Sequence, residues 1–202
     1  MAALTRERIL TCAVAMADRD GLDAVTLRRI AGELGVHVTS LYNHVETRDA
    51  ITDGIVEALL DEAHLPVTPL GWEEWTRSFL SAMDTLAGQH PGAFAAFSHR
   101  PVQGPRAAAS FEVALGAFGE AGLSPQDAYG AVKSVAFVGL MVGTERSMAA
   151  RGQQLETAMD ELPAESFPRF HALEGHDPTS AWSFSTETLV AGLRAQIAAS
   201  GH

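Results

Sequence analysis

The chain is poor in the residues that mark extracellular and membrane proteins. Its 202 residues include one cysteine, Cys12, so no disulfide can form within the chain. The longest apolar stretch, residues 135–143, is too short to span a bilayer. Arg6, Glu7 and Arg8 interrupt the N-terminus before the apolar segment of a signal peptide could form. These absences predict a cytoplasmic protein without a disulfide framework and without a membrane partner.

Catalytic motifs are missing as well. The sequence contains no G-x-x-x-x-G-K-[ST] phosphate loop, no G-x-G-x-x-G motif and no G-x-S-x-G nucleophile elbow. His171, Glu174, His176 and Asp177 lie close together in sequence and could hold a divalent cation, but polar clusters in loops are usually solvated. We therefore expect no enzymatic activity, no metal site and no cofactor.

Strand signals are scarce, whereas helix signals are frequent. Ala, Leu, Glu and Arg are abundant, and no alternating apolar and polar pattern persists. We predict an all-α fold, with helices over residues 6–20, 48–62, 72–88, 93–99, 105–120, 125–151 and 181–199, and with a loop containing one short helix at 152–179. Residues 65–71 contain two prolines and a glycine, which is typical of a linker between domains.

Residues 26–48 carry the most informative pattern, which predicts two short helices joined by a tight turn. The first helix has an apolar stripe at helical spacing, formed by Leu27, Ile30, Ala31 and Leu34. Thr26 stands at the N-cap position, and Gly35 permits a left-handed turn. Val36 begins the second element, in which Leu41 and Val45 form a thin apolar face. This arrangement is typical of a helix-turn-helix, whose second helix enters the major groove of DNA.

The other face of the second helix is polar. It presents hydroxyl, amide and imidazole groups, from His37, Thr39, Ser40, Tyr42, Asn43 and His44. Such groups can read base edges and bind phosphates. Two amphipathic helices around a glycine also occur in proteins that never bind DNA, so two alternatives stay open: a helical small-molecule-binding protein and a helical adaptor. The helix before the pair and the longer one after it favour a three-helix DNA-binding head.

Charge is distributed unevenly along the chain. The formal net charge is −11, but residues 1–48 hold equal numbers of arginines and acidic residues, so the excess belongs to residues 49–202. A neutral head can bind phosphates while an acidic body faces away from them. We expect modest sequence-independent affinity for DNA that falls steeply with salt.

The first 62 residues resemble the DNA-binding domain of TetR-type transcriptional repressors. The segments that carry this resemblance are RILTCAVAMADRDGLDAVTLRRIAGELGV and TSLYNHVETRDAITDGIVEALLDE. Further along, WEEWTRSFLSAM, SHRP and FGEAGLSPQDAYGAVKSVAFVGL are similar to the ligand-binding domain of the tetracycline-repressor branch of this family. The resemblance implies a helix-turn-helix domain over 1–48, a connecting helix over 49–64, and a helical ligand-binding and dimerisation domain over 65–202.

The same resemblance implies roles for single residues in the head. Arg28 would reach a base or a phosphate from the first helix of the pair, while His44 and Arg48 would contact the DNA backbone. Val38 and Thr39 replace the polar and proline residues of the tetracycline-repressor branch, so the operator of that branch cannot be transferred to this chain. The predicted DNA-binding residues are Arg28, His37, Thr39, Ser40, Tyr42, Asn43, His44 and Arg48.

Apolar side chains on the inward faces of the body helices are either ordinary core or the wall of a ligand pocket. The candidate pocket consists of apolar residues with four possible polar contacts: Phe79, Met83, Leu86, Phe97, Phe111, Leu115, Phe118, Val138 and Met141, with His64, His99, Arg100 and Trp182. By resemblance, His64 matches a ligand-contacting histidine. Ala96 stands in place of the family's metal-coordinating histidine, which argues against a tetracycline–magnesium ligand. We expect a hydrophobic or aromatic effector.

A homodimer is expected because one short recognition helix reads too few base pairs for useful specificity. Small residues in the helix over 125–151 and in the last helix permit close packing, either within one subunit or between two: Gly130, Gly139, Gly143, Ala191, Gly192 and Ala195. The resemblance implies a four-helix dimer interface. The sequence therefore predicts a ligand-responsive regulator, a repressor that a small molecule releases from a palindromic operator, with activation as the open alternative.

Overall fold

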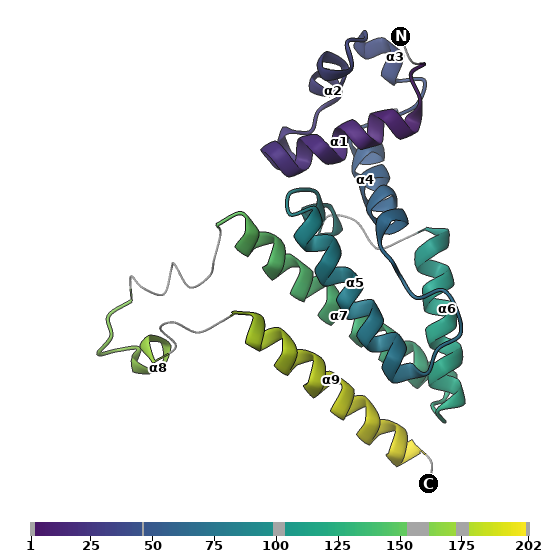
Figure 1. Ribbon diagram of the computed structural model, residues 1–202, viewed down its shortest axis with the longest axis vertical. Coiled ribbons are helices and arrows are strands. Elements are labelled where there is room, and N and C mark those ends of the chain that lie inside the picture. The colour runs from purple at the N-terminus through teal and green to yellow at the C-terminus, as the bar shows by residue number, and fades with distance from the viewer. Residues whose placement is uncertain (1–2, 46, 99–103, 153–161, 173–177, 201–202) are drawn as a thin grey trace.

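The computed structural model describes residues 3–45, 47–98, 104–152, 162–172 and 178–200, and all regular secondary structure in these ranges is helical. Figure 1 shows a head of short helices, one helix leading out of it and a body of longer helices. The all-α prediction is confirmed. Within the described ranges, no helix has both the length and the apolar character needed to cross a membrane.

The head consists of short helical elements: α1 (Arg6–Asp20), the 3-10 turn η1 (Leu22–Ala24), α2 (Leu27–Leu34) and α3 (Val38–Leu41). The hydroxyl of Thr26 accepts a hydrogen bond from the backbone N–H of Arg29 at 3.2 Å, so it caps α2 as predicted. Gly35 ends α2 in the left-handed conformation, with φ of 66°. Both local predictions for this turn are confirmed.

The recognition element is shorter than the sequence predicted. The N–H of Val36 donates to the carbonyl of Ala31 at 3.0 Å, so Val36 belongs to the C-terminal cap of α2, and α3 begins only at Val38. The chain then continues as a hydrogen-bonded turn, in which the N–H of Val45 donates to the carbonyl of Leu41 at 2.9 Å. A single helical turn is not stable by itself. Burial of Leu41 and Val45 therefore holds this element in place.

Helix α4 (Arg48–Glu62) connects the head to the body (Figure 1). The hydroxyl of Thr47 caps it by accepting a hydrogen bond from the N–H of Ala50 at 3.0 Å. Ile55 and Leu59 on its inner side are fully buried. Helix α4 thus packs against both the head and the body.

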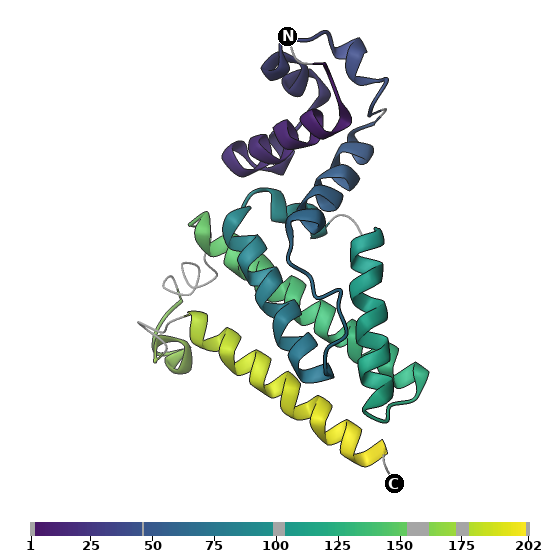
Figure 2. The same ribbon diagram turned by 45° about the vertical axis from the view of Figure 1, so that its right-hand side comes forward.

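The body contains the longer helices, namely α5 (Trp72–Gln89), the 3-10 segment η2 (Ala93–Ser98), α6 (Pro105–Glu120), α7 (Pro125–Ala150), the short α8 (Pro168–His171) and α9 (Pro178–Ser200). Helices α5 and α7 pack along one another at its centre, and α6 and α9 each pack against both (Figures 1 and 2). The short α8 lies within the segment predicted as a loop with one short helix. The last helix begins at Pro178, three residues before the predicted start at 181.

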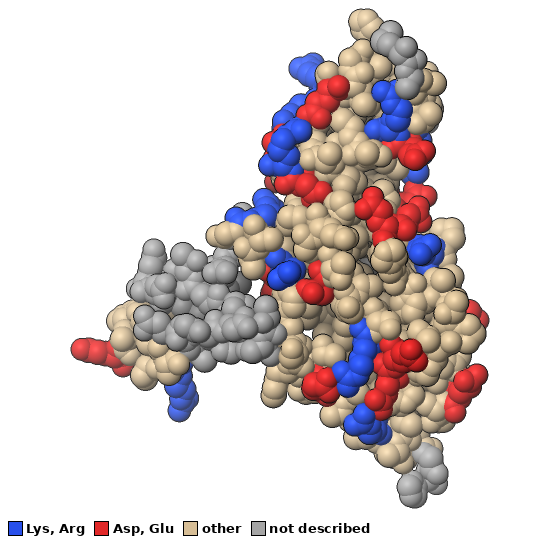
Figure 3. All heavy atoms as spheres, in the orientation of Figure 1, with Lys and Arg blue, Asp and Glu red and all other residues tan. Residues whose placement is uncertain are grey.

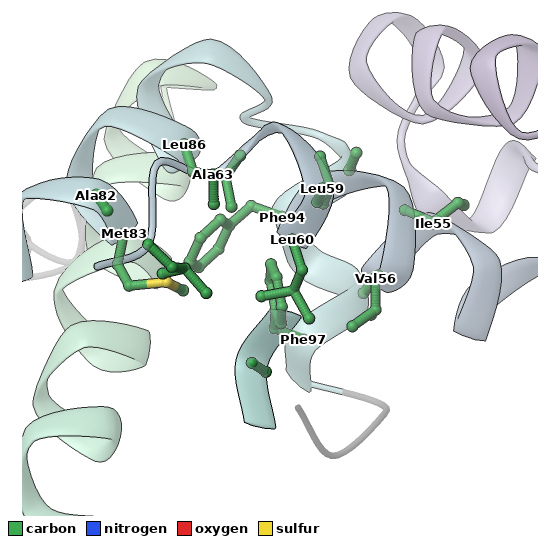
Figure 4. Close-up of a cluster of buried hydrophobic side chains, with 14 of the residues drawn as sticks. Ile55, Val56, Leu59, Leu60, Ala63, Ala82, Met83, Leu86, Phe94 and Phe97 are labelled. Carbon is green, nitrogen blue, oxygen red and sulfur yellow. The ribbon is translucent and has the colours of Figure 1, made fainter. Parts of the chain in front are cut away.

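The buried core runs without interruption from the head into the body. Figure 4 shows the place where α4, α5 and η2 meet, with Leu60, Phe94 and Phe97 pointing toward one another. Helix α7 approaches this cluster closely because Gly143 carries no side chain: a Cβ there would lie 2.2 Å from the ring of Phe94. Gly139 likewise faces Phe79 within the same subunit. The sequence left open whether the glycines of this helix pack within one subunit or between two. Gly139 and Gly143 pack within one subunit.

Candidate DNA-binding surface and effector groove

The predicted DNA-binding residues come from three neighbouring elements of the head: the start of α2, α3 with the turn after it, and the start of α4. Seven of them are exposed, namely Arg28, His37, Thr39, Tyr42, Asn43, His44 and Arg48. Ser40 is half-buried. The fully buried Leu41 lies among them and turns the polar side chains outward. The structure thus presents these groups together on one end of the molecule.

The arginines of the head differ in how they are held. Arg29 forms an ion pair with Asp20, and Arg48 forms one with Asp23 at 3.2 Å. Because the Asp23 side chain is fully exposed, its pair with Arg48 is weak, and a phosphate can take its place. Arg28 is exposed and has no ion-pair partner among the described residues. Its guanidinium is therefore available to an anionic ligand.

Most of the apolar residues predicted to line a pocket lie in the core of the body. Phe79, Met83, Leu86, Phe97 and Phe118 are buried, and Phe111, Leu115, Val138 and Trp182 are half-buried. Trp75, which the prediction omitted, is fully buried at the centre of this group. Its ring stacks on Phe79 at 5.1 Å between centroids, and its Nε1–H donates to the carbonyl of Ser110 at 3.0 Å. Aromatic packing of this kind stabilises the body.

The inward-facing prediction is wrong for Met141, whose side chain is 61% exposed. Met141 lies one helical turn after the equally exposed Phe137, and this face of α7 points away from α5. The helical period places Gly139 and Gly143 on the opposite face, against the core. The predicted contacts His99 and Arg100 lie outside the described residues.

A groove of about 490 Å³ lies between the C-terminal end of α4 and the outer side of α5. Its walls are formed by Glu62, Ala63, His64, Arg77, Ser78, Ser81, Ala82, Thr85, Leu86 and Gln89. Of the predicted pocket residues, His64 and Leu86 take part. The polar residues of α5 were missed, although Ser78, Ser81 and Thr85 recur at helical spacing and so share one face. The groove offers hydroxyl, amide, imidazole and charged groups beside the apolar side chains of Ala63, Ala82 and Leu86.

The candidate metal cluster is only partly visible. Glu174, His176 and Asp177 lie outside the described residues, whereas the Nε2–H of His171 donates to the carbonyl of Leu162 at 2.8 Å. In the parts of the chain that the structure describes, no group of three or more His, Cys, Asp or Glu residues is placed as metal ligands would be.

The head and the body together define a class of protein. A three-helix head presents a polar recognition element held by buried anchors, and α4 joins this head to a helical body with a groove beside the joint. This is the architecture of a helix-turn-helix transcriptional regulator whose DNA-binding head is linked to an effector domain.

Comparison with known proteins identifies the family. None of the protein-family models matches the chain. A helix-turn-helix-type transcriptional regulator of Saccharopolyspora erythraea is 32% identical over 206 residues, which cover 95% of this chain and 85% of the relative. The class D tetracycline repressor of Escherichia coli is 25% identical over 205 residues, covering 98% and 93% of the two chains. The crystal structure of the Streptomyces coelicolor TetR family protein ActR in complex with actinorhodin matches with a TM-score of 0.80 and 27% identity, over 97% of this chain and 99% of that chain.

The chain belongs to the TetR family of helix-turn-helix transcriptional regulators. It is a ligand-responsive DNA-binding protein, and the resemblance seen in its sequence is confirmed.

Proposed function

We propose that this protein is a homodimeric repressor that binds a palindromic operator and leaves it when a small molecule occupies the body. The exposed, polar recognition element on its buried Leu41 anchor is the observation that carries this proposal. Relatives named as tetracycline repressors support the repressor role. We retain the division into a DNA-binding domain over 1–48, a connecting helix over 49–64 and an effector and dimerisation domain over 65–202.

In this proposal the eight predicted residues share the work of DNA binding. His37, Thr39, Ser40 and Asn43 face the base edges in the major groove. Arg28 reaches a base or phosphate from α2, and the hydroxyl of Tyr42 donates to a phosphate. His44 and Arg48 also contact the backbone, with Arg48 exchanging Asp23 for a phosphate oxygen.

A homodimer is supported by an apolar face on α7 and α9. Tyr129, Phe137 and Met141 of α7 are 55%, 61% and 61% exposed, and Phe184 of α9 is 73% exposed. Exposed large apolar side chains on two neighbouring helices are typical of an interaction surface. Gly130, Ala191, Gly192 and Ala195, the other predicted packing residues, are exposed on the same two helices. A second copy that buries these helices against its own would form the expected four-helix interface.

The effector is proposed to bind the groove beside α4 and α5. Because Glu62 and His64 stand at the C-terminal end of the connecting helix, an occupant touches the element that carries Arg48 at its other end. A ligand shifts such an equilibrium only by its different affinity for the two positions of α4. The sequence alone favoured a hydrophobic effector, and the lining of the groove adds a requirement for hydrogen-bonding groups. His99, Arg100 and the half-buried Trp182 stay as predicted contacts.

The proposal is tested by selecting bound duplexes from a random pool and then measuring the affinity of the double variant Arg28→Ala, Tyr42→Ala for the selected sequence. We expect an enriched palindrome, and at least about tenfold weaker binding by the double variant, because it loses one charged and one hydroxyl contact. Arg169→Ala, which removes an exposed arginine of α8, serves as the control and should bind normally.

Two results would contradict this proposal. Failure to enrich any sequence at low salt would exclude operator binding and favour a purely ligand-binding or adaptor role. Enrichment with an unaffected double variant would overturn the assignment of Arg28 and Tyr42 while leaving the repressor role in place.

A further inference from the structure

His90 lies where three helix ends meet. It follows the last residue of α5, and its ring is in contact with the ends of both α1 and α4. Its Nδ1 lies 2.7 Å from Oδ2 of Asp18, near the end of α1, and its Nε2 lies 2.9 Å from Oε2 of Glu62, the last residue of α4. The side chain is only 19% exposed. One imidazole therefore joins the head, the connecting helix and the body.

The two carboxylates are held very differently. Oδ1 of Asp18 also accepts hydrogen bonds from the backbone N–H groups of Gly92 and Ala93, at 3.1 and 2.9 Å, so Asp18 stays in place without the imidazole. The side chain of Glu62 is 56% exposed, and His90 is its only hydrogen-bond or ion-pair partner among the described residues. The contact between Glu62 and His90 is therefore the one that can be broken while Asp18 stays in place.

The protonation state of His90 decides whether both contacts can form. A neutral imidazole has one N–H, whereas two carboxylates facing both ring nitrogens require two, which only the imidazolium provides. Burial lowers the pKa of His90, but the hydrogen bonds to Asp18 and Glu62 outweigh this and raise the pKa above the ordinary histidine value. The imidazolium is the form that fits this geometry.

Other charged side chains lie around His90, but only Asp18 and Glu62 hold its imidazolium. A groove of about 560 Å³ between α1 and α4 has His90 in its wall together with Arg6, Glu7, Glu57 and Asp61. Arg6 is paired with Glu57 at 2.7 Å, and Glu7 and Asp61 line the groove without contacting His90. From α7, Arg146 lies near Gly88, and beyond the end of that helix Arg151 lies near Gly21. The described residues of η2 carry no charged side chain.

We propose that Asp18, His90 and Glu62 form a proton-operated clamp on the connecting helix. When His90 is protonated, it holds the end of α4 against α1 and α5. As the pH rises through the pKa of His90, the neutral ring keeps its hydrogen bond to the anchored Asp18 and releases Glu62. Because Glu62 also lines the effector groove, its release changes the wall of that groove as well.

The effect on folding stability has a definite sign. A histidine whose pKa is raised in the folded state stabilises it fully below the unfolded-state pKa, and this contribution is lost as the pH rises through the folded-state pKa. The clamp should therefore stabilise the protein at pH 6 and no longer do so at pH 9. This consequence is independent of DNA binding, whereas any effect on operator affinity rests on the proposed function.

The clamp is tested by comparing Glu62→Gln with Asp61→Asn in chemical denaturation at pH 6 and pH 9. Both substitutions remove one carboxylate from the end of α4, but only Glu62 contacts His90. We expect Glu62→Gln to lower the denaturation midpoint at pH 6 and to have little effect at pH 9, while Asp61→Asn changes it equally at both. An equal loss for Glu62→Gln at the two pH values would overturn the proposal.

A second readout is the titration of His90 itself, followed by NMR of the histidine ring protons and assigned with His90→Gln. We expect the pKa of His90 to fall toward its ordinary value in Glu62→Gln and to stay unchanged in Asp61→Asn. An unchanged pKa in Glu62→Gln would mean that Glu62 does not hold the imidazolium, and the clamp would be rejected.

Operator affinity gives the functional readout. Because His37 and His44 also belong to the proposed DNA-binding surface, the informative quantity is the difference between wild type and His90→Gln. We expect the ratio of affinities at pH 6 and pH 9 to differ between the two proteins by about fivefold or more. Equal ratios would show that the clamp does not control DNA binding. If no duplex binds at all, the proposed function fails, and the stability and NMR results still decide whether the clamp exists.

Discussion

At Gly92 the chain of the body passes very close to the backbone of α1 in the head. A Cβ at this position would lie 2.0 Å from the carbonyl oxygen of Ala17 in α1 and 2.6 Å from the Cα of Asp18. Both are backbone atoms, so they cannot swing aside as the end of a flexible side chain can. The glycine thus permits the contact in which Asp18 accepts hydrogen bonds from the N–H groups that begin η2.

Substitution of Gly92 by Ala should destabilise the protein by about 1–3 kcal/mol, because the backbone of α1 must move to admit the methyl group. Gly116→Ala is the matched control, since this helical glycine of α6 has no neighbour within 4 Å of the added Cβ. The control should gain about 0.5–1 kcal/mol from the better helix propensity of alanine. Chemical denaturation of both variants measures the difference, and a neutral Gly92→Ala would contradict the tight contact.

Helices α4 and α3 are stabilised in two different ways. Helix α4 carries its own start signal in Thr47 and is long enough to hold a complete buried side. The single turn of α3 lacks both features. Its N-cap residue His37 makes no side-chain capping bond, and the position of α3 depends on the burial of Leu41. The same difference explains why the sequence predicted the start of α4 correctly and the start of α3 two residues too early.

The cap of α4 can be tested by Thr47→Ala, which we expect to cost about 1 kcal/mol, because the N–H of Ala50 loses its acceptor. Thr52→Ala is the control. The Thr52 hydroxyl donates to the carbonyl of Arg48 within the helix, a bond that adds little stability. Thermal unfolding of the two variants should separate them, and equal midpoints would argue against capping by Thr47.

Across the molecule as seen in Figure 3, charged side chains of both signs are intermingled, whereas large exposed apolar side chains occur on α7 and α9. On the face shown in Figure 3, arginines and acidic side chains are intermingled over the head rather than gathered in a basic patch. We therefore expect sequence-independent attraction to DNA to be modest, and a useful affinity to require two heads on one site. The exposed aromatic face of α7 and α9 is the surface through which we propose that two copies join.

Phe137→Glu should convert the proposed dimer to a monomer, because the substitution places a charge within the apolar face. Val67→Glu introduces the same charge at an exposed apolar position in the linker between α4 and α5, and it should leave the association intact. Sedimentation equilibrium reports the mass, and operator affinity should fall at least about tenfold in the monomer, which binds one half-site. A wild-type protein that sediments as a monomer would refute the dimer, as would a Phe137→Glu variant that remains dimeric.

Prediction of the sites from the sequence succeeded only in part. The exposure of Arg28, Tyr42 and their neighbours followed from a helical period read over a few turns. The effector groove did not follow, because its walls combine the end of α4 with a polar face of α5 that has no special composition. Met141 was misplaced because α7 has apolar residues on more than one face, so its period does not show which face meets the core.

The sequence by itself determined the helices, the cap at Thr26, the left-handed turn at Gly35 and the polar face of the recognition element. These features arise from interactions between residues a few positions apart, and periodicity and capping chemistry record them directly. Only the tertiary structure placed His90 beside Asp18 and Glu62, which are 72 and 28 positions away in sequence. Contacts over such separations depend on how whole helices pack. Neither the groove nor the clamp could therefore be predicted from a local pattern.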